Sequence, residues 1–268
     1  MQGVSTRKVA AITEQLCGFE VSSGQVSRAA QELDGVLEAW RQRPLSTCPY
    51  LLLDARYEKV RQGGLVQDAA VLIAMGVDAA GKRSVLGVSV ALSEQETHWR
   101  QFLQSLVGRG LGEVRLIVSD AHEGLKAARQ AVFGSTLWQR CQFHLQQNAS
   151  AYVPRQEMKA QVATDIRAVF NAQDRAEADA LLKRAVQKYE TVAPKLTAWM
   201  ELALPEGLAV FALPEPHRRL LRTSNSVERV TPTKPQSRGA ASDAGSKHLP
   251  ERGLVPAFGE RTADGDQR

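Results

Sequence analysis

The sequence predicts a mixed α/β fold, and three observations predict it. Five strand-like runs are expected: residues 49–58, 70–77, 84–90, 114–119 and 137–143. The first three follow one another, with a hairpin turn at 78–82 before the third, which favours antiparallel pairing. Helical segments separate the third, fourth and fifth runs, which favours crossover connections. Hairpins followed by crossovers indicate a mixed sheet.

Residues 1–45 are expected to form a helix-turn-helix-like element. Two helices joined by a tight turn fit the apolar spacing, and a serine at 22 or 23 can cap the second helix. The apolar stripe of that helix is Val26, Ala30, Leu33, Leu37 and Trp40. Gln25, Ser27 and Arg28 lie near its start, where such a helix reads base edges, so they are candidate DNA contacts. A helical hairpin that only packs on the next domain is the alternative.

Residues 46–229 are expected to form one large core. Ser93 and Glu96 have the spacing of a capping box, and they open a helix that carries Trp99 on its apolar face. Another helix, with Leu125 on its apolar face, links the fourth and fifth strands. Three strands, a helix, a strand, a helix and a strand form the element order of the ribonuclease-H-like fold. In that fold the first and fourth strands are neighbours.

The last third of the chain changes character twice. Residues 146–213 have strong helical periodicity and are expected to form a helical insertion in the core. Asp174 can cap one of its helices, and Pro194 is expected to interrupt the next one near its start. Glycine, proline, serine and charged residues dominate residues 230–268. This composition cannot bury enough apolar surface to fold, so a disordered tail is expected.

Composition and charge limit the class of protein. The chain has 268 residues, 43% of them hydrophobic and 24% charged, which is ordinary for a globular protein with a full core. No apolar run approaches the roughly 20 residues of a membrane helix, and no signal pattern opens the chain, so a cytoplasmic location is expected. Three cysteines are too few for a disulfide framework. The net charge of +5 fits a polyanionic partner.

Three acidic residues in separate contexts form the candidate catalytic site. Asp54 and Asp120 each end an apolar strand, and Glu228 lies in the polar run 222–229, which is typical of a helix start. Carboxylate oxygens are ligands that Mg²⁺ prefers, and two such ions about 3.5–4 Å apart support phosphodiester transfer. We expect Asp54 to bridge both ions. Asp120 would bind the ion at the nucleophile, and Glu228 the ion near the leaving group.

Spacing alone leaves a second interpretation of these acids open. Aspartates at strand ends are common, and an α/β enzyme that acts on a small molecule would show the same pattern. No complete glycine-rich phosphate loop supports that interpretation.

Four blocks of the sequence resemble, in order, those of the mutator-type bacterial DDE transposases. They are residues 51–61 around Asp54, 118–125 around Asp120, 139–148 with a Cys-x-x-His pattern, and 222–229 around Glu228. The region 5–45 also resembles the helix-turn-helix region of that family. The resemblance covers about residues 3–229.

The resemblance implies an insertion-sequence transposase, a polynucleotidyl transferase that cleaves and transfers DNA strands. It implies catalysis by Asp54, Asp120 and Glu228 with Mg²⁺, or with Mn²⁺ as the alternative ion. The implied partners are terminal inverted repeats and target DNA. A homodimer on DNA is expected because two transposon ends must be brought together, and the expected location is at the nucleoid.

Two departures from the family pattern lead us to expect a degenerate copy with impaired or lost activity. We do not expect the additional N-terminal DNA-binding segment of the family. After Arg229 the family continues with a basic helical block, whereas this chain turns to the proline-containing run 230–235, as a frameshift would produce. Pro232 is expected to stop the Glu228 helix after about one turn.

The sequence leaves two other functions open. One is a non-catalytic DNA-binding remnant that occupies transposon ends or inhibits intact transposase. The other is a structure-specific nuclease on the same scaffold. Metal-dependent nicking separates the transposase from the remnant, and strand joining separates it from the nuclease.

Several further residues have two interpretations each. Candidate phosphate contacts, with a solvated surface as the alternative, are Arg56, Arg61, Arg218, Arg219 and Arg222. Cys141 and His144 have a spacing that can bind zinc. Two more ligands are lacking, so we favour Cys141 in the core and His144 at a helix start. Trp199 could stack on a flipped base, but core packing is the commoner role at helical spacing.

Overall fold

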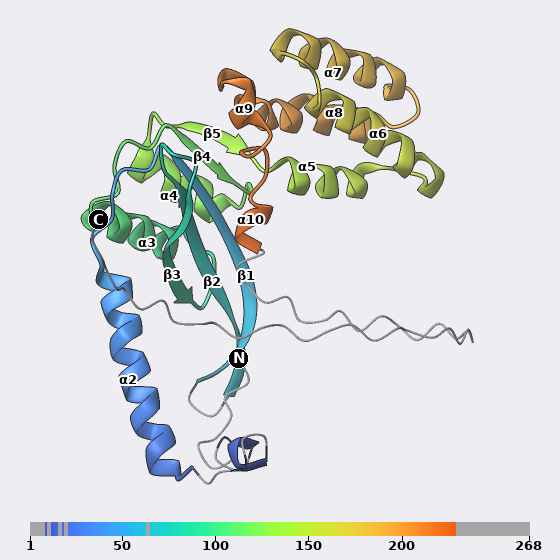
Figure 1. Cartoon of the computed structure of the whole chain (residues 1–268). Helices are drawn as coiled ribbons and strands as arrows, with labels where there is room; N and C mark the ends of the chain where they lie inside the picture. Colours follow the sequence, from blue (N-terminus) through green and yellow to red (C-terminus); the bar gives the residue numbers. More distant parts are fainter. Residues whose placement is uncertain (1–8, 10–11, 16–17, 19–20, 63–64, 229–268) are drawn as a thin grey trace, which may run out of the picture. The chain divides into compact units, whose positions relative to one another are not determined.

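The computed structural model describes residues 9, 12–15, 18, 21–62 and 65–228, and of Arg61, Gln62 and Glu228 it describes the backbone (Figure 1). The strands are β1 (Tyr50–Gln62), β2 (Leu65–Val77), β3 (Arg83–Ala91), β4 (Leu116–Ser119) and β5 (Leu137–Arg140). The longer helices are α2 (Ser23–Gln42), α3 (Glu96–Gly108), α4 (Glu123–Phe133), α5 (Gln142–Ala149), α6 (Lys159–Phe170), α7 (Arg175–Tyr189) and α8 (Pro194–Ala203). The short helices are η1 (Ser150–Tyr152), η2 (Gln156–Met158), η3 (Leu204–Gly207), η4 (Ala209–Ala212), α9 (Glu215–Arg218) and α10 (Asn225–Glu228).

The five strands form one mixed sheet in the order β3-β2-β1-β4-β5. β1 pairs antiparallel with β2, and β2 with β3, whereas β1 pairs parallel with β4, and β4 with β5. The predicted mixed α/β sheet is confirmed, and so is the neighbouring position of the first and fourth strands. The predicted end of β5 at residue 143 is wrong, because α5 already begins at Gln142. β1 and β2 run longer than predicted, since they extend together as a two-stranded hairpin.

Side-chain alternation along the strands assigns each face of the sheet its own core. Leu51, Leu53 and Ile117 pack with the apolar faces of α3 and α4, including the fully buried Trp99. Leu52 and Val118, one residue away, lie on the opposite face with a cluster that contains Leu221 and Val227. α10, which holds Val227, therefore covers the face opposite to α3 and α4.

Gly124, in the first turn of α4, lies against the chain segment that leads into α3. A Cβ on Gly124 would clash with the carbonyl oxygen of Glu94 and would lie 2.9 Å from the backbone nitrogen of Glu96. We expect Gly124→Ala to lower the free energy of unfolding by about 1–3 kcal/mol, because both partners are backbone atoms that cannot rotate away. Urea denaturation measures the change. Gly108→Ala is the matched control, since nothing lies within 4 Å of the added Cβ, and an equal loss there would contradict the prediction.

Three local predictions have different outcomes. The capping box at Ser93 is wrong, because α3 begins at Glu96 with Gln95 as its N-cap, and no side chain caps it. Asp174 does cap α7, since its side chain accepts a hydrogen bond from the backbone N–H of Glu177 (2.8 Å). Pro194 is the first residue of α8 rather than an interruption within a helix. A missing N–H costs nothing at that position.

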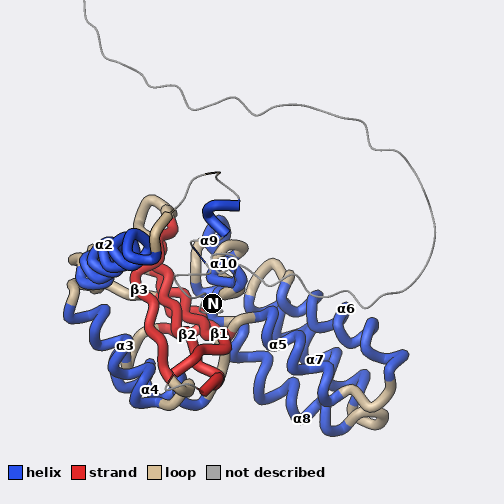
Figure 2. Tube along the Cα trace, turned by 90° about the horizontal axis from the view of Figure 1, so that it is seen from below, coloured by secondary structure: helices blue, strands red, loops and turns tan. Residues whose placement is uncertain are grey.

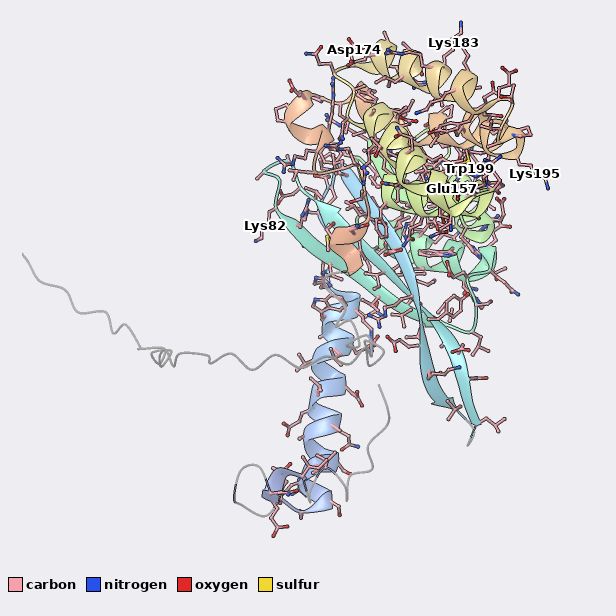
Figure 3. All side chains as sticks on the ribbon, turned by 90° about the vertical axis from the view of Figure 1, so that its right-hand side faces the viewer. Lys82, Glu157, Asp174, Lys183, Lys195 and Trp199 are labelled. Carbon is pink, nitrogen blue, oxygen red and sulfur yellow. The ribbon has the colours of Figure 1, made fainter. Side chains whose placement is uncertain are left out.

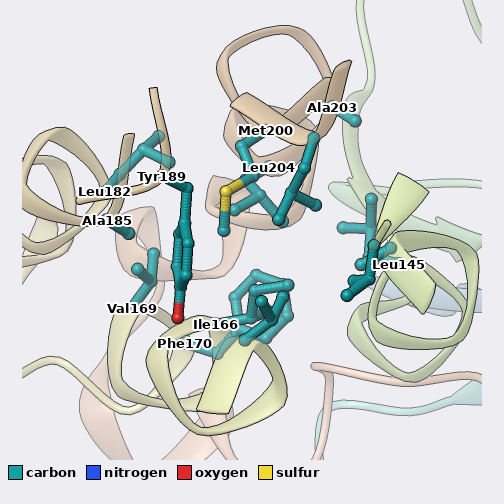
Figure 4. Packing of buried hydrophobic residues seen from close by; sticks show 14 of the residues in the cluster. Leu145, Ile166, Val169, Phe170, Leu182, Ala185, Tyr189, Met200, Ala203 and Leu204 are labelled. Atoms are coloured by element: carbon teal, nitrogen blue, oxygen red, sulfur yellow. The ribbon is translucent and has the colours of Figure 1, made fainter. Parts of the chain in front are cut away.

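Between β5 and α10 the chain is helical and has a core of its own. Figure 2 shows α5 to α8 gathered as one group, and Figure 4 shows Leu145 of α5, Phe170 of α6, Tyr189 of α7 and Met200 of α8 meeting in its interior. Trp199 lies at the edge of this core (Figure 3), where its ring stacks on Tyr152 with centroids 5.4 Å apart. That packing agrees with the structural interpretation of Trp199.

Asp165 connects α6 to α7 through exposed and half-buried hydrogen bonds. Lys188 Nζ and Tyr189 Oη both donate to Asp165 Oδ2 at 2.6 Å, and Gln161 donates to Oδ1 at 3.1 Å. Burial opposes ionisation of Asp165, but these hydrogen bonds outweigh it and lower the pKa of the carboxyl below its usual 3.8. The ionised carboxylate therefore stabilises the folded chain above about pH 4, and that stabilisation disappears as the pH falls through the lowered pKa.

We expect Asp165→Asn to lower the free energy of unfolding at pH 7 by about 1–2 kcal/mol. The difference from the parent chain should shrink when both are compared near pH 3, because Asp165 is then largely protonated in the unfolded chain and increasingly so in the folded one. Thermal unfolding at the two pH values measures both changes. Asp179, which pairs with Arg175 on the surface of α7, provides Asp179→Asn as a control with an expected loss of about 0–1 kcal/mol. A pH-independent difference for Asp165→Asn would contradict the assignment.

α2 begins as predicted, with Ser22 as N-cap and Gln25 completing a capping box. Its predicted apolar stripe is not buried, since Leu33 and Leu37 are 57% and 37% exposed. Arg43, directly after α2, connects to the core because it donates to the carbonyl of Val85 and its own carbonyl accepts from Arg109 Nε (2.9 Å). The turn and most of the first predicted helix lie outside the described residues, as does the predicted tail at 230–268. In the described part, no helix is long and apolar enough to cross a membrane.

Candidate active site

Asp54 and Asp120 come together at one end of the parallel pair β1 and β4. Leu52 and Val118 are partners in the parallel register, and continuing that register by two residues brings Asp54 opposite Asp120. Both side chains line one pocket of about 110 Å³, with Glu94, His122 and His144 also in its wall. The predicted meeting of two strand-end carboxylates, 66 positions apart in the sequence, is therefore present in the structure.

The two carboxylates point to the face of the sheet that α10 covers. Because side chains alternate along a strand, Asp54 faces the same side of the sheet as Leu52, and Asp120 the same side as Val118. Leu52 and Val118 both pack in the cluster that contains Val227. α10 contacts β1 and β2, and it ends at Glu228, the third predicted acid. The side chain of Glu228 lies outside the described residues, so its approach to Asp54 and Asp120 stays a prediction.

Asp120 has a defined set of neighbours. The backbone N–H of Ala121 donates to its Oδ1 at 2.7 Å, which holds the carboxylate against the chain. Arg140 Nε, at the end of β5, lies 3.9 Å from the same oxygen, and Arg140 Nη1 donates to Glu206 Oε2 at 3.0 Å. Sequence reasoning missed Arg140 and Glu206. A signal was present for Arg140 alone, since it ends the strand next to β4.

Glu94 is a second residue that the sequence analysis missed. Its side chain is 13% exposed, and its Oε2 lies 4.0 Å from Nδ1 of His122, which directly precedes α4. Glu94 follows the end of β3 closely, so the strand-end rule that selected Asp54 and Asp120 could have selected it as well.

Cys141 and His144 form a pair at the start of α5. Cys141 is fully buried and is the N-cap of α5, which confirms the structural interpretation of this cysteine. Burial opposes ionisation of its thiol, but hydrogen bonds from His144 outweigh it and lower the pKa of Cys141 below its usual 9.0. The hydrogen bond to Cys141 raises the pKa of His144 to about 9 against the effect of burial, and the charges of Asp120 and Asp54 contribute to the rise.

Cys141 also connects the two acidic strand ends to the segment before α10. Its backbone N–H donates to the carbonyl of Ser119 at 2.7 Å, one residue before Asp120. Its Sγ accepts from the backbone N–H of Ser224 at 3.4 Å. The backbone N–H of Gln142 donates to the carbonyl of Arg222 at 3.0 Å. The turn at 141–142 thus holds the end of β4 and the start of α10 together.

The donor set of the pocket suits a hard divalent cation, because carboxylate oxygens are the ligands that Mg²⁺ and Mn²⁺ accept. Asp54 and Asp120 supply two such groups from rigid strand ends. Among the side chains that the structure describes, no group of three or more histidines, cysteines, aspartates or glutamates lies close enough to hold a metal ion. A three-carboxylate site therefore depends on Glu228.

The predicted DNA contacts are distributed over separate elements. Gln25, Ser27 and Arg28 are exposed on α2, where the Gln25 side chain already accepts from the Ser22 backbone. Arg56 forms an ion pair with Glu58 on β1, and the side chain of Arg61 lies outside the described residues. Arg218, Arg219 and Arg222 line one pocket beside the end of α6 and the loop that follows it.

Fold and site together define the class of protein: a mixed α/β protein with paired carboxylates at adjacent parallel strand ends and a helical insertion before a third, helical acid. The family model described as "Transposase, Mutator family" matches residues 1–236. The chain belongs to the Mutator family of transposases, and its relatives are transposases of insertion sequences.

Named relatives agree with that assignment. The chain is 57% identical to the transposase for insertion sequence element IS406 of Burkholderia multivorans, over 86% of this chain and 60% of the relative. It is 42% identical to the transposase for ISRM5 of Rhizobium meliloti, over 86% and 58%. It is 36% identical to the transposase for IS1081 of Mycobacterium tuberculosis, over 85% and 55%. The chain thus spans somewhat more than half the length of these relatives.

Among solved structures, a chain of the simian T-cell lymphotropic virus intasome in complex with the PP2A regulatory subunit B56 gamma matches at 14% identity. The match covers 83% of this chain and 71% of that chain with a TM-score of 0.22, which is too low to carry an argument.

Proposed function

We propose that this chain cleaves DNA strands at the ends of an insertion sequence and transfers them to target DNA. The proposal includes a ribonuclease-H-like core and a metal-binding site made of Asp54, Asp120 and Glu228. The observation that carries it is the shared pocket of Asp54 and Asp120, two carboxylates that a parallel strand pair brings side by side. Membership in a family of transposases supports DNA as the substrate.

The side chains of the pocket have separable roles in this mechanism. Asp54 and Asp120, anchored on strand ends, would hold the divalent metal ions, and Glu228 would complete the ligand set from α10. When bound, two such ions activate the attacking oxygen and stabilise the leaving oxygen of the phosphodiester. Arg140 lies 3.9 Å from Asp120 and would partly offset its negative charge, while Glu206 shares the charge of Arg140.

DNA binding would use other parts of the chain. Residues 1–45 form the proposed helix-turn-helix-like element, in which Gln25, Ser27 and Arg28 face the major groove. Phosphate contacts are assigned to Arg56 and to basic residues near α10. A homodimer is proposed because two transposon ends must meet before strands are exchanged.

A nicking and joining assay tests the function. A labelled duplex with the ends of the encoding element is incubated with the chain and Mg²⁺, and an unlabelled target duplex is added. We expect metal-dependent nicks at the element ends and joined products. Nicks without joined products would favour the structure-specific nuclease. DNA binding without nicks would favour the non-catalytic remnant, which could still inhibit an intact transposase.

The composition change after Arg229 is the specific observation that favours a degenerate copy. Residues 230–235 contain two prolines, which are incompatible with the interior of a helix that continues α10. We therefore propose that Glu228 is held less firmly than in an active relative and that cleavage is slow. Cleavage at the rate of the IS406 transposase, lost on Asp54→Ala, would contradict degeneracy while supporting the catalytic site.

A further inference from the structure

Three arginines line a pocket of about 490 Å³ that is separate from the acidic site. The pocket lies between residues 170–173, at the end of α6 and in the loop that follows, and the segment 210–222. Arg218, Arg219 and Arg222 contribute three positive charges to its wall, and Glu215 contributes one negative charge. The pocket therefore has an excess of positive charge, which is the electrostatic requirement of an anion site.

The pocket is a built structure rather than a chance gathering of surface charges. Arg218 donates from Nε to the carbonyl of Leu213 (2.9 Å) and from Nη1 to the carbonyl of Gln173 (2.8 Å). Arg222 Nη1 donates to the carbonyl of Phe170 (3.2 Å) and to Asn171 Oδ1 (2.6 Å). Backbone and amide oxygens thus fix two half-buried guanidinium groups in place. Within the described residues these bonds leave both Nη2 groups without a partner.

Arg219 differs from its two neighbours. It is exposed, and among the described residues no hydrogen bond or ion pair involves its guanidinium. Burial and the positive charge of Arg219 both lower the pKa of the Arg222 guanidinium below its usual value, so the two like charges are held together at a cost. A bound anion would relieve that repulsion and use the remaining N–H groups, which suit a phosphate.

The position of the pocket suggests which phosphate it takes. The segment 215–222 leads directly into α10, and its Arg222 carbonyl is hydrogen-bonded to Gln142, next to the turn that holds Asp120. A phosphate bound here would be fixed relative to the acidic strand ends by the protein backbone. We propose that the pocket binds a backbone phosphate of duplex DNA outside the cleavage site, through Arg218, Arg219 and Arg222. The assignment of DNA as the ligand rests on the proposed function.

Salt-dependent DNA binding of the full chain tests this site. Fluorescence anisotropy is measured with a labelled duplex of the element end and with an unrelated duplex of equal length, between about 50 and 200 mM salt. We expect Arg219→Ala to weaken binding to both duplexes about fivefold to tenfold. The slope of log affinity against log salt should fall by about one. Arg219→Glu should have a larger effect, and Glu215→Gln should strengthen binding. Unchanged affinity and slope for both Arg219 variants would overturn the proposal.

Three controls make the outcome specific. Lys183→Ala removes one positive charge from the outer side of the helical group, where Figure 3 shows Lys183 projecting away from it, and should leave affinity and slope unchanged. Since Arg219 is exposed and anchors no backbone group, its variants should melt at the parent temperature. Inorganic phosphate and chloride are compared, at matched ionic strength, as competitors of duplex binding. If Arg219→Glu abolished phosphate competition but left duplex binding intact, the pocket would bind free phosphate and the DNA assignment would be overturned.

Failure of this proposal can be told apart from failure of the proposed function. If the chain nicks DNA in a metal-dependent way but the Arg219 variants bind DNA normally, the pocket proposal is wrong and the proposed catalytic function stands. If the salt dependence of DNA affinity depends on Arg219 but the chain never nicks DNA, the pocket proposal stands and the non-catalytic remnant is supported.

Discussion

Asp54→Asn is expected to abolish Mg²⁺-dependent nicking of element ends, with a loss of about a thousandfold or more. Asparagine keeps the size of the side chain but removes the negative charge that would hold a divalent ion. A loss of several kcal/mol in transition-state stabilisation corresponds to at least this factor. Asp120→Asn should have a similar effect, because both carboxylates line the same pocket. The measurement is the single-turnover nicking rate of a labelled duplex at saturating protein.

DNA binding separates lost chemistry from lost structure in these variants. Both should bind the duplex at least as tightly as the parent chain, since each removes a negative charge near the phosphates. The matched control is Asp68→Asn on β2, where the aspartate pairs with Lys59 on the exposed hairpin, and its nicking rate should be unchanged. Parent-like nicking by Asp54→Asn and Asp120→Asn would remove the metal site from the mechanism. Removal of divalent ions by a chelator should give the same loss as the substitutions.

Cys141→Ala is expected to reduce nicking about tenfold to a hundredfold without removing any proposed metal ligand. Sγ of Cys141 accepts the backbone N–H of Ser224, in the segment that leads into α10. Alanine leaves that buried N–H without an acceptor, at a cost of about 1–3 kcal/mol, and it frees the start of α10 to move. A displacement of about 1 Å at a reacting group can cost a hundredfold in rate. Nicking rates and urea midpoints measure the two effects.

Other substitutions show whether Cys141 acts through position. Cys141→Ser keeps an acceptor at this place and should recover part of the rate. Cys48→Ala is the matched control, because Cys48 is a buried cysteine next to Gly76 in the main core, far from α10 in the chain. It should lower stability without a selective loss of nicking. If Cys141→Ala lost stability but nicked at the parent rate under folding conditions, α10 would not depend on this contact.

Much of the fold was predictable because its signals are local. Apolar, strand-like runs predicted all five strands, and helical spacing predicted α3, α4 and the helices after β5. The misplaced boundaries have local causes as well. The Ser93 capping box fails because α3 starts at Glu96, so Ser93 precedes the N-cap, and its carbonyl contacts His98 instead. Pro194 was misjudged because its effect depends on whether a helix has already started.

The site was only half predictable for a different reason. The sequence alone shows that each aspartate ends an apolar run, and the expected strand order predicted that Asp54 and Asp120 lie close together. Glu94 and Arg140 were missed although both lie at or just after a strand end, where the rule that selected the aspartates could have found them. Glu206 was missed because it approaches from η3, whose packing on β5 no local pattern records. Family membership supports transposition in general, and the role of Glu228 stays a proposal.

The sequence by itself determined the elements, the two strand-end aspartates, the helical insertion and the family, since these depend on spacing along one chain. Tertiary structure alone decided that both aspartates share a face with α10 and that Cys141 bridges β4 to α10. It also decided that three arginines close a pocket with the loop after α6. The physical reason is that contacts between distant segments depend on how whole elements pack, which is a property of the assembled core.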